Sequence, residues 1–455
     1  MSRPPTILWF RRDLRFADHP ALAKAASRGP VLALFVIDPA LMGPAGLARR
    51  VFLLRTLHYI DRRLRDLGGQ LVVDRGQPEH VVSNLARRVG AAEVHVSADF
   101  GPYGAQRDRR VAAALGSIPL VQTGSPYAVS PHRLTTATGQ SYKVFTPFFR
   151  AWRRHGWPDP ASSDAQQVEW AVLPVDGLPD APTLPAGVSL PTAGEDAAQD
   201  AWWGFRTERL SGYGDSRDRP DLDTTSRLSA YLHIGALHPR TLLSTLGPDD
   251  ERFTAELAWR EFYASVLWSW PESARANFDG RMSGLQQPDD PAADAHFEAW
   301  CEGRTGYPIV DAGMRQLRAE AWMHNRVRML TASFLVKDLH LDWRRGARHF
   351  MQHLVDGDLA SNQHGWQWTA GTGTDASPYF RIFNPVTQSK RFDPDGDYIR
   401  RWVPELRAAR TAYVHEPWRS PEPLDYVDPI VDHDVERKRS LAAYEALRRG
   451  ATAPG

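Results

Sequence analysis

The chain of 455 residues contains a single cysteine, Cys301. One cysteine excludes a disulfide framework and a cysteine-based metal cluster, and it fits a reducing compartment. No run of 18 apolar residues occurs, and the first residues do not read as a charged and apolar leader. We therefore expect a cytoplasmic, monomeric protein that neither spans nor enters a membrane.

Two kinds of ligand-binding motif are also missing. The sequence has no G-x-G-x-x-G and no G-x-x-x-x-G-K-[ST], which excludes the usual dinucleotide and nucleoside-triphosphate loops. Its 16 histidines form no H-E-x-x-H or similar cluster, so no metal site is predicted. The net charge of +1 points to no partner by itself.

Tryptophan, in contrast, is abundant, with 16 residues against seven methionines. Two of these indoles, Trp366 and Trp368, lie in the segment DGDLASNQHGWQWTAGTG at 356–373, which also carries two carboxylates and an amide but no lysine or arginine. A second uneven stretch is 303–349, where nine Lys/Arg face four Asp/Glu. That stretch is a candidate basic patch, and a solvated helix face is the alternative.

The first third of the chain alternates short apolar runs with amphipathic segments. Strands are predicted at 6–10, 31–37, 70–74, 93–97 and 119–123, and helices at 21–26, 50–67 and 78–89. Such alternation predicts a parallel sheet covered by helices on both faces, in a Rossmann-like α/β domain. The carboxyl-terminal edge of such a sheet can hold a ligand.

The composition divides the chain into three parts: an α/β domain at 1–130, a linker at 131–200, and a helical domain at 201–455. Residues 156–200 contain seven prolines and eight Asp/Glu but no Lys/Arg, which is typical of an extended surface segment. After Trp202 the apolar spacing is helical, notably over 253–270 and 312–341.

Three polar motifs lie in this helical part. Glu256, Trp259 and Arg260 share one helix face, as do Asn325, Arg328 and Met329. An ordinary surface ion pair beside a core tryptophan explains the first triplet equally well. In TTSRLSAYL (224–232), Thr225 or Ser226 is expected to cap a helix, and the same exposed N–H groups could cradle a phosphate.

Taken together, these motifs resemble the DNA photolyase/cryptochrome family, and most closely class I cyclobutane pyrimidine dimer photolyases. The resemblance covers nearly the whole chain and is carried by WFRRDLR (9–15), TSRLSAYL, ELAWREFY, GRTGYPIVDAGMRQL, WMHNRVRM, DGDLASN, GWQW and YFRIFNP. It implies an α/β antenna domain, a linker, and a helical domain that holds FAD, together with light-driven repair of pyrimidine dimers in DNA.

The resemblance also implies the residues that contact FAD. Asp356 would pair with Arg328 beside the isoalloxazine, Asp358 would accept hydrogen bonds from the flavin side, and Asn362 would face flavin N5. The rest of the cradle would be Tyr213, Thr225, Ser226, Leu228, Ser229, Arg260 and Asn325. In such a site the cofactor performs the redox chemistry and the protein orients it.

By the same resemblance, Trp366 and then Trp343 would pass electrons to photoexcited flavin. Trp259 and Trp368 would wall the pocket for a flipped dimer, and Glu256 would hydrogen-bond the thymine edges. The remaining DNA contacts would come from Asn325 and Met329 at the dimer and from Arg217 and Arg326 at the phosphates. Core packing is the alternative for each tryptophan.

Relatives often end this electron path at a surface tryptophan ahead of the AWxxGxTGYP segment. Alignment on Trp300 places that position among Gln287–Asp290, where no tryptophan occurs. The path is therefore predicted to stop at Trp343, or to divert to another aromatic residue that the sequence does not identify. Gln363 and His364 also depart from the family, where smaller residues are common.

The antenna chromophore is expected to be 8-hydroxy-5-deazaflavin rather than a reduced folate. Folate-binding relatives tend to carry Asn-Glu in the loop after the fourth strand, where this chain has Tyr103 and Gly104. Candidate lining residues are Phe35, Arg50 and Asp99.

Three alternative functions predict other sequence features. A (6-4) photolyase would have a histidine at Met329, a cryptochrome photoreceptor often has Asp or Cys at Asn362, and a flavin oxidoreductase would need a hydride site, which is not seen.

Overall fold

The computed structural model describes residues 3–174, 177–285, 291–374 and 381–451. The chain divides into two compact units. Unit 1 comprises 1–184, 190–211 and 226–271, and unit 2 comprises 185–189, 212–225 and 272–455. Each unit is described by itself below.

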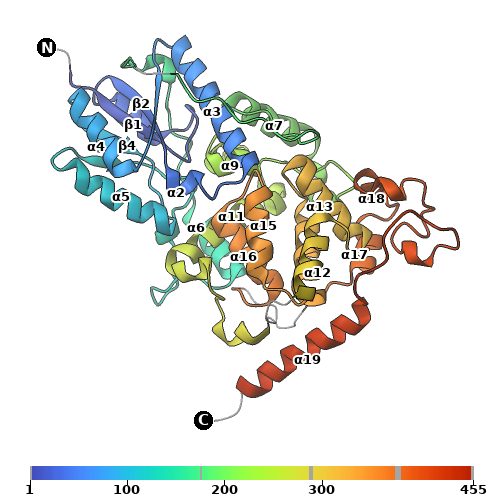
Figure 1. The fold of residues 1–455 in the computed structure, drawn as a ribbon. Helices are drawn as coiled ribbons and strands as arrows, with labels where there is room; N and C mark the ends of the chain where they lie inside the picture. The colour runs from blue at the N-terminus through green and yellow to red at the C-terminus, as the bar shows by residue number, and fades with distance from the viewer. Residues whose placement is uncertain (1–2, 175–176, 286–290, 375–380, 452–455) are drawn as a thin grey trace. The chain divides into compact units, whose positions relative to one another are not determined.

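Unit 1 is built on a five-stranded parallel sheet (Figure 1). The strands run in the order β3-β2-β1-β4-β5. Their bounds are β1 Thr6–Phe10, β2 Val31–Ile37, β3 Leu71–Arg75, β4 Glu93–Val96 and β5 Leu120–Gln122. All five predicted strands are confirmed to within a residue or two at either end. Every residue of β1 and β2 is buried, as expected for strands covered on both faces.

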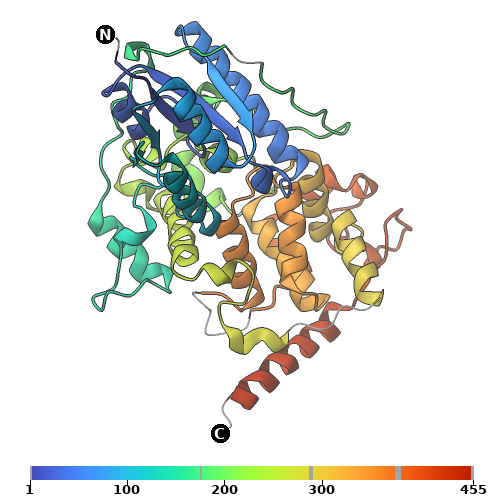
Figure 2. The same ribbon diagram turned by 60° about the vertical axis from the view of Figure 1, so that its left-hand side comes forward.

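Helices pack on the strands as the predicted alternation requires (Figure 2). The helices α4 (Pro78–Val89) and α5 (Pro102–Leu115) pack together, and their apolar side chains join those of the strands in one core cluster. The helices α1 (Pro20–Ala26) and α3 (Leu47–Asp66) also contact the strands. The segment after β4, which is predicted to be a loop, is mostly helix α5; Gly101 is the N-cap of that helix and Pro102 is its first residue.

The other helices of unit 1 lie outside the sheet. The bounds are α2 Pro39–Met42, α6 Phe145–His155, α7 Glu195–Glu208, α9 Ser229–Ile234, α10 Pro239–Leu243 and α11 Glu251–Ser269. The Pro-rich segment 156–200 is largely irregular where it is described, but it is tied down. The Trp170 backbone bridges to Val31 of β2, and Glu195 accepts hydrogen bonds from the N–H groups of Phe16 and Ala17.

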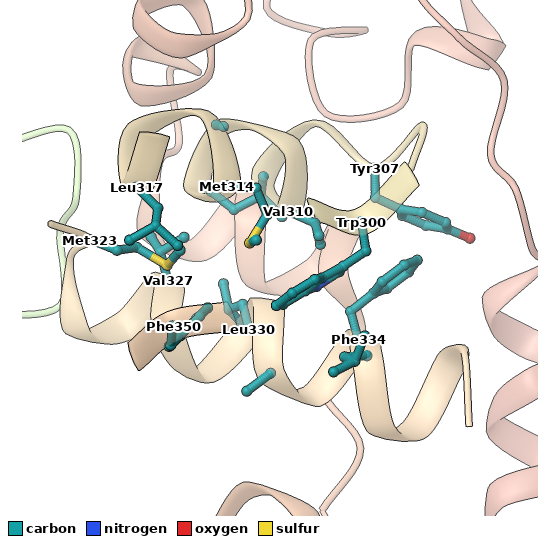
Figure 3. Packing of buried hydrophobic residues seen from close by; sticks show 14 of the residues in the cluster. Trp300, Tyr307, Val310, Met314, Leu317, Met323, Val327, Leu330, Phe334 and Phe350 are labelled. Atoms are coloured by element: carbon teal, nitrogen blue, oxygen red, sulfur yellow. The ribbon is translucent and has the colours of Figure 1, made fainter. Parts of the chain in front are cut away.

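Unit 2 is helical. Its helices are α8 Tyr213–Ser216, α12 Pro291–Glu302, α13 Pro308–Glu320, α14 Asn325–Ser333, α15 Trp343–His353, α16 Leu359–Ala370, α17 Pro385–Phe392, α18 Asp397–Trp402 and α19 His433–Ala451, with a π-helical turn at Phe334–Asp338. Figure 3 shows the centre of its core, where Trp300 of α12 lies with Val310 of α13 and Leu330 of α14. The predicted change from α/β to helical architecture is confirmed.

The apolar stretch 312–341 is not one continuous helix. It breaks after α13 because Ala321 adopts the left-handed conformation, with φ of +48°. The His324 side chain then accepts the Arg326 N–H and caps α14. A non-glycine residue in this conformation is uncommon, so the sequence gives little warning of the break.

Within the described residues, no helix is both long and apolar enough to cross a bilayer. The same residues contain no group of three His, Cys, Asp or Glu side chains placed to hold a metal ion.

Candidate active site

An ion pair between the partly exposed Arg328 and the buried Asp356 joins α14 to the segment before α16. Arg328 Nη2 lies 2.8 Å from Asp356 Oδ2, and Arg328 Nε donates to the Met323 carbonyl at 2.8 Å. The predicted Arg328–Asp356 pair is thus confirmed. Asp356 Oδ1 is buried and has no hydrogen-bond partner among the described residues. A buried carboxylate oxygen of this kind is costly unless something else donates to it.

Two other polar residues of this segment have hydrogen-bond partners on α15 and α16. Asp358 is the N-cap of α16 and accepts the Ser361 N–H at 3.0 Å. Asn362 Nδ2 donates to the Ala347 carbonyl at 3.2 Å and to Gln363 Oε1 at 2.9 Å. Because its nitrogen is engaged twice, the Asn362 side chain presents Oδ1 as an acceptor.

Gln363 and His364, which depart from the family pattern, have definite partners. Gln363 Nε2 donates to the Ala274 carbonyl at 2.6 Å, so this side chain fixes the Asn362 amide. His364 Nδ1 donates to the Ala360 carbonyl at 2.7 Å, and its Nε2 lies 3.0 Å from Ser273 Oγ. Burial lowers the pKa of His364, so it stays neutral at neutral pH. Sequence reasoning missed Gln363 as a supporting residue.

The indoles of α16 face different surroundings. Trp366 is buried, whereas Trp368, two residues on, is half-buried. Trp366 lies against Gly346 of α15, where a Cβ would come within 2.1 Å of the indole. Trp343 is also fully buried, and its Nε1 donates to Asn277 Oδ1 at 2.8 Å. The Trp366 Nε1 is buried without a partner among the described residues.

The two arginines predicted to bind phosphates share one aspartate. Arg326 holds Asp218 through two nitrogens, with Nη2 2.7 Å from Oδ2 and Nε 3.3 Å from Oδ1. Arg217 Nε lies 3.9 Å from the same carboxylate. A DNA phosphate would therefore compete with Asp218 for these side chains. Beside them, Asn325 Nδ2 and Met329 Sδ are 4.0 Å apart, so these two residues share a side of α14 as predicted.

In unit 1, two of the predicted site residues on α11, Arg260 and Trp259, already contact other parts of the protein. Arg260 donates to the carbonyls of Pro126 and Leu232 at 2.9 and 3.1 Å. The Trp259 indole stacks on Phe145, with ring centroids 3.7 Å apart and planes 6° from parallel. One face of this indole is therefore covered by protein. Glu256 is half-buried on the same helix.

The TTSRLS segment does not cap its helix as predicted. The N-cap of α9 is Leu228, whose side chain cannot accept a hydrogen bond, so the prediction of a Thr225 or Ser226 cap is wrong. Ser226 Oγ instead lies 3.5 Å from the Leu228 N–H. Arg227 between them has a φ of +51°, a strained conformation of the kind found at ligand sites. Ser229 begins α9, and Tyr213, which begins α8 in unit 2, is buried.

One of the three antenna candidates, Asp99, lies at a cavity in unit 1. Asp99 lines a cavity of about 830 Å³ together with Phe100, Tyr127, His132 and Trp268, whereas Phe35 and Arg50 are not among its lining residues. Burial alone would raise the pKa of Asp99, but Arg107 and Arg11 lower it below its ordinary value.

Gly104 packs directly on the same carboxylate, because a Cβ there would meet it at 2.1 Å. The glycine found at this position in the sequence is therefore required by Asp99.

Known proteins are similar to this chain over nearly its whole length. The DNA photolyase family model matches residues 6–166, and the model for the FAD binding domain of DNA photolyase matches residues 253–446. Proteins named deoxyribodipyrimidine photo-lyase from Halobacterium salinarum and Escherichia coli are each 39% identical to this chain, over 97% and 98% of it and 99% of their own lengths.

Solved structures agree. A bacterial class III photolyase from Agrobacterium tumefaciens superposes with a TM-score of 0.89 at 36% identity, covering 99% of this chain and 98% of that chain. An archaeal photolyase from Sulfolobus tokodaii, solved with two FAD molecules, gives 0.85 at 28% identity, covering 97% and 100%. A Synechocystis cryptochrome gives 0.86 at 26%, covering 97% and 99%. The chain belongs to the DNA photolyase family.

Proposed function

We propose that this protein repairs cyclobutane pyrimidine dimers in DNA by light-driven electron transfer from reduced FAD. The reaction would break the two carbon–carbon bonds that link the pyrimidines and return the electron, with no net redox change. The observation that carries the proposal is the Arg328–Asp356 pair, in which one buried carboxylate oxygen is left for a ligand in a chain that has the family's FAD-binding domain.

The residues of unit 2 fit a flavin. Asp356 Oδ1 needs a hydrogen-bond donor, and Asn362 Oδ1 is an acceptor whose orientation is fixed by Ala347 and Gln363. A flavin ring offers both donors and acceptors along one edge. When bound, FAD would supply the light absorption and the one-electron exchange. Asn362, being neutral, would add no negative charge near the N5 position of the reduced ring.

The dimer would be contacted by groups from three helices, α11 in unit 1 and α14 and α16 in unit 2. Glu256 of α11 would hydrogen-bond the pyrimidine edges, while Trp259 and Trp368 would provide flat apolar surfaces for stacking. Phe145 supports the Trp259 indole from one side, and the rings of Phe262 and Tyr263 lie 5.6 and 5.3 Å from it. Asn325 and Met329, on a shared side of α14, would complete the contact.

Arg217 and Arg326 would bind phosphates of the damaged strand. Each contact would release a counterion, so binding should weaken steeply as salt increases. Asp218 positions Arg326 through a bidentate pair and opposes its use by DNA.

The test is a repair assay on an oligonucleotide with one thymine dimer, under blue light and in darkness. Light-dependent loss of the dimer is expected, and Glu256→Gln should lower the yield per photon while FAD stays bound. A photoreceptor without repair activity, which is the alternative function, would give no loss under either condition. Repair of a (6-4) photoproduct instead would contradict the role given to Met329.

We also propose that unit 1 binds an antenna chromophore, with 8-hydroxy-5-deazaflavin favoured over a reduced folate. The cavity of about 830 Å³ is large enough for such a ligand and is lined by aromatic and charged side chains. In it, Phe100 stacks on His132 at 5.3 Å and meets the edge of Trp268 at 5.7 Å. Mass spectrometry of the chromophore extracted from protein made in a deazaflavin-producing host tests this; folate or a second FAD would contradict it.

A further inference from the structure

Gln363 connects Asn362 to a second part of unit 2, the segment 272–278. Its Nε2 donates to the Ala274 carbonyl at 2.6 Å, and its Oε1 accepts from Asn362 Nδ2 at 2.9 Å. Asn362 Nδ2 also donates to the Ala347 carbonyl of α15 at 3.2 Å. The two side-chain amides therefore lie in a row that begins and ends at a backbone carbonyl.

These two carbonyls determine the orientation of both amides. A backbone carbonyl can only accept, so the NH2 group of Gln363 must point at Ala274 and that of Asn362 at Ala347. A turned Asn362 amide would place its oxygen 3.2 Å from the Ala347 oxygen and 2.9 Å from Gln363 Oε1. Turning Gln363 as well would place two oxygens 2.6 Å apart at Ala274. Asn362 Oδ1 is therefore the atom that is left for a ligand.

The Ala274 carbonyl is a fixed anchor because the residues on either side of it are tied to two helices. The preceding Ser273 is buried, and its carbonyl accepts from Gln367 Nε2 of α16 at 2.7 Å. The carbonyl of the following Arg275 accepts from Arg344 Nε of α15 at 2.7 Å. Supporting contacts of this kind hold a site residue in one geometry before the ligand binds.

We propose that Gln363 is a positioning residue that makes Asn362 a fixed acceptor opposite flavin N5, and that it thereby favours reduced over oxidised FAD. The inference rests on the proposed function, which puts FAD beside Asn362. Oxidised flavin has a lone pair on N5, which an amide oxygen repels. Reduced flavin has an N–H at the same atom, which that oxygen accepts.

Spectroelectrochemistry of the FAD-loaded protein tests the proposal. An electrode supplies two electrons through a mediator, and solvent supplies the proton that N5 gains. Gln363→Met removes both amide contacts but keeps a side chain of similar length. We expect it to lower the ratio of reduced to oxidised FAD at a fixed potential by about tenfold, which is about 30 mV for a two-electron couple.

Gln367→Met is the matched control. It removes another glutamine contact from α16 to the same segment, at the Ser273 carbonyl, without touching Asn362. The segment stays tied to α15 in this variant, so its potential should equal that of the parent even where its free energy of unfolding falls. An equal shift of the potential in both glutamine variants would overturn the positioning role, because loosening of the segment alone would then explain it.

A double-variant cycle with Asn362→Ala isolates the coupling between the two amides. If Gln363 acts through Asn362, Gln363→Met should change the ratio by less than about twofold in the Asn362→Ala background. Equal changes in both backgrounds would overturn the inference. If the parent repairs dimers in light, only the inference is then lost, whereas a parent that binds no FAD overturns the proposed function as well.

Two further measurements keep the proposal testable. The dissociation constants of oxidised and reduced FAD should show the same tenfold change in their ratio, and an unchanged ratio would contradict the proposal. The shift should also be equal at about pH 6 and about pH 8, because neither amide titrates. A shift that varies with pH would assign the effect to a titrating group instead. If Gln363→Met does not fold, Gln363→Ala replaces it with the same expected change.

Discussion

Two buried aspartates, one in each unit, pair with an arginine in different ways. Asp18 in unit 1 accepts from Arg240 at 2.6 Å, from the Ala161 N–H at 2.7 Å and from Thr241 at 3.2 Å, so both carboxylate oxygens are engaged. Asp356 in unit 2 accepts from Arg328 at 2.8 Å through one oxygen and leaves the other without a partner. The first arrangement is complete as folded, whereas the second is complete only with a ligand.

The difference separates a carboxylate that holds the fold from one that serves a site. Asp18 ties together residues distant in sequence, and nothing further can bind to it. Asp356 is buried to a similar extent, at 7% exposure against 4%, so burial alone does not distinguish the two. What distinguishes them is the count of donors, which requires the structure.

The largest effect is expected for Asp18→Asn. Removing one charge from a buried, hydrogen-bonded pair should lower the free energy of unfolding by about 3 kcal/mol. Denaturant unfolding measures it, and a change below about 1 kcal/mol would remove the distinction drawn here.

The pH dependence of the free energy of unfolding gives a second test of Asp18. Burial alone would raise the pKa of Asp18, but His238, the Ala161 N–H and Arg240 lower it well below 3.8. The folded state therefore binds fewer protons than the unfolded chain around that pH. The stabilisation is present above pH 3.8 and is lost as pH falls towards the folded pKa. Asp18→Asn should flatten this acid limb of the stability curve.

Gly346→Ala should disturb the packing of α15 against the Trp366 indole of α16 without changing a polar group. The added methyl would lie 2.1 Å from the Trp366 ring and 2.5 Å from Leu335, both buried. Overpacking of this kind should cost about 2 kcal/mol and displace the indole. Gly365→Ala is the control, since nothing lies within 4 Å of that position. Thermal unfolding followed by tryptophan fluorescence would measure both, and equal values would contradict the close packing.

Asp356→Asn should affect FAD more than the fold. Its ion pair with the partly exposed Arg328 is lost, but no second buried donor is stranded. We expect unfolding to change by about 1 kcal/mol and FAD affinity to fall about tenfold. Fluorescence titration of released FAD measures the affinity. Unaltered FAD affinity with a large loss of stability would show that Asp356, like Asp18, holds the fold and does not serve a ligand site.

The smallest effect is expected at the half-exposed pair of Asp218 with Arg326. Asp218→Asn removes the carboxylate that Arg326 holds, so DNA affinity should rise by a few-fold, since such pairs contribute about 1 kcal/mol or less. The salt dependence should steepen by roughly one counterion. Titration at two salt concentrations decides it, and weaker binding would show that Asp218 only positions Arg326.

The sequence predicted the sheet well because five short apolar runs have little choice but to become buried strands. Helix α5 was not predicted, because the polar residues after Gly101 and Pro102 are typical of a loop. The packing of this helix on α4 is a tertiary contact that the local sequence does not show. The helical spacing over 312–341 also gave no sign of an interruption, because the break depends on one alanine, Ala321, in a left-handed conformation.

At the site, the Arg328–Asp356 pair was predictable from motifs. The N-cap on α9 and the Gln363–Ala274 contact were not, as both depend on tertiary packing. The roles given to Tyr213, Ser229 and the other cradle residues stay predictions. The position expected for a further tryptophan, among Gln287–Asp290, lies outside the described residues.

The left-handed turn at Ala321 also provides an amide whose hydrogen-exchange rate reports on the site. Its carbonyl accepts the N–H of Val355 at 2.8 Å, one residue before Asp356, and α14 with Arg328 begins four residues after it. A single amide proton thus sits where both partners of the ion pair are anchored, and it exchanges with solvent only when that anchor opens. Deuterium uptake at Val355 would report the opening free energy of this corner, and bound FAD should slow that uptake while leaving the strands of the sheet unchanged.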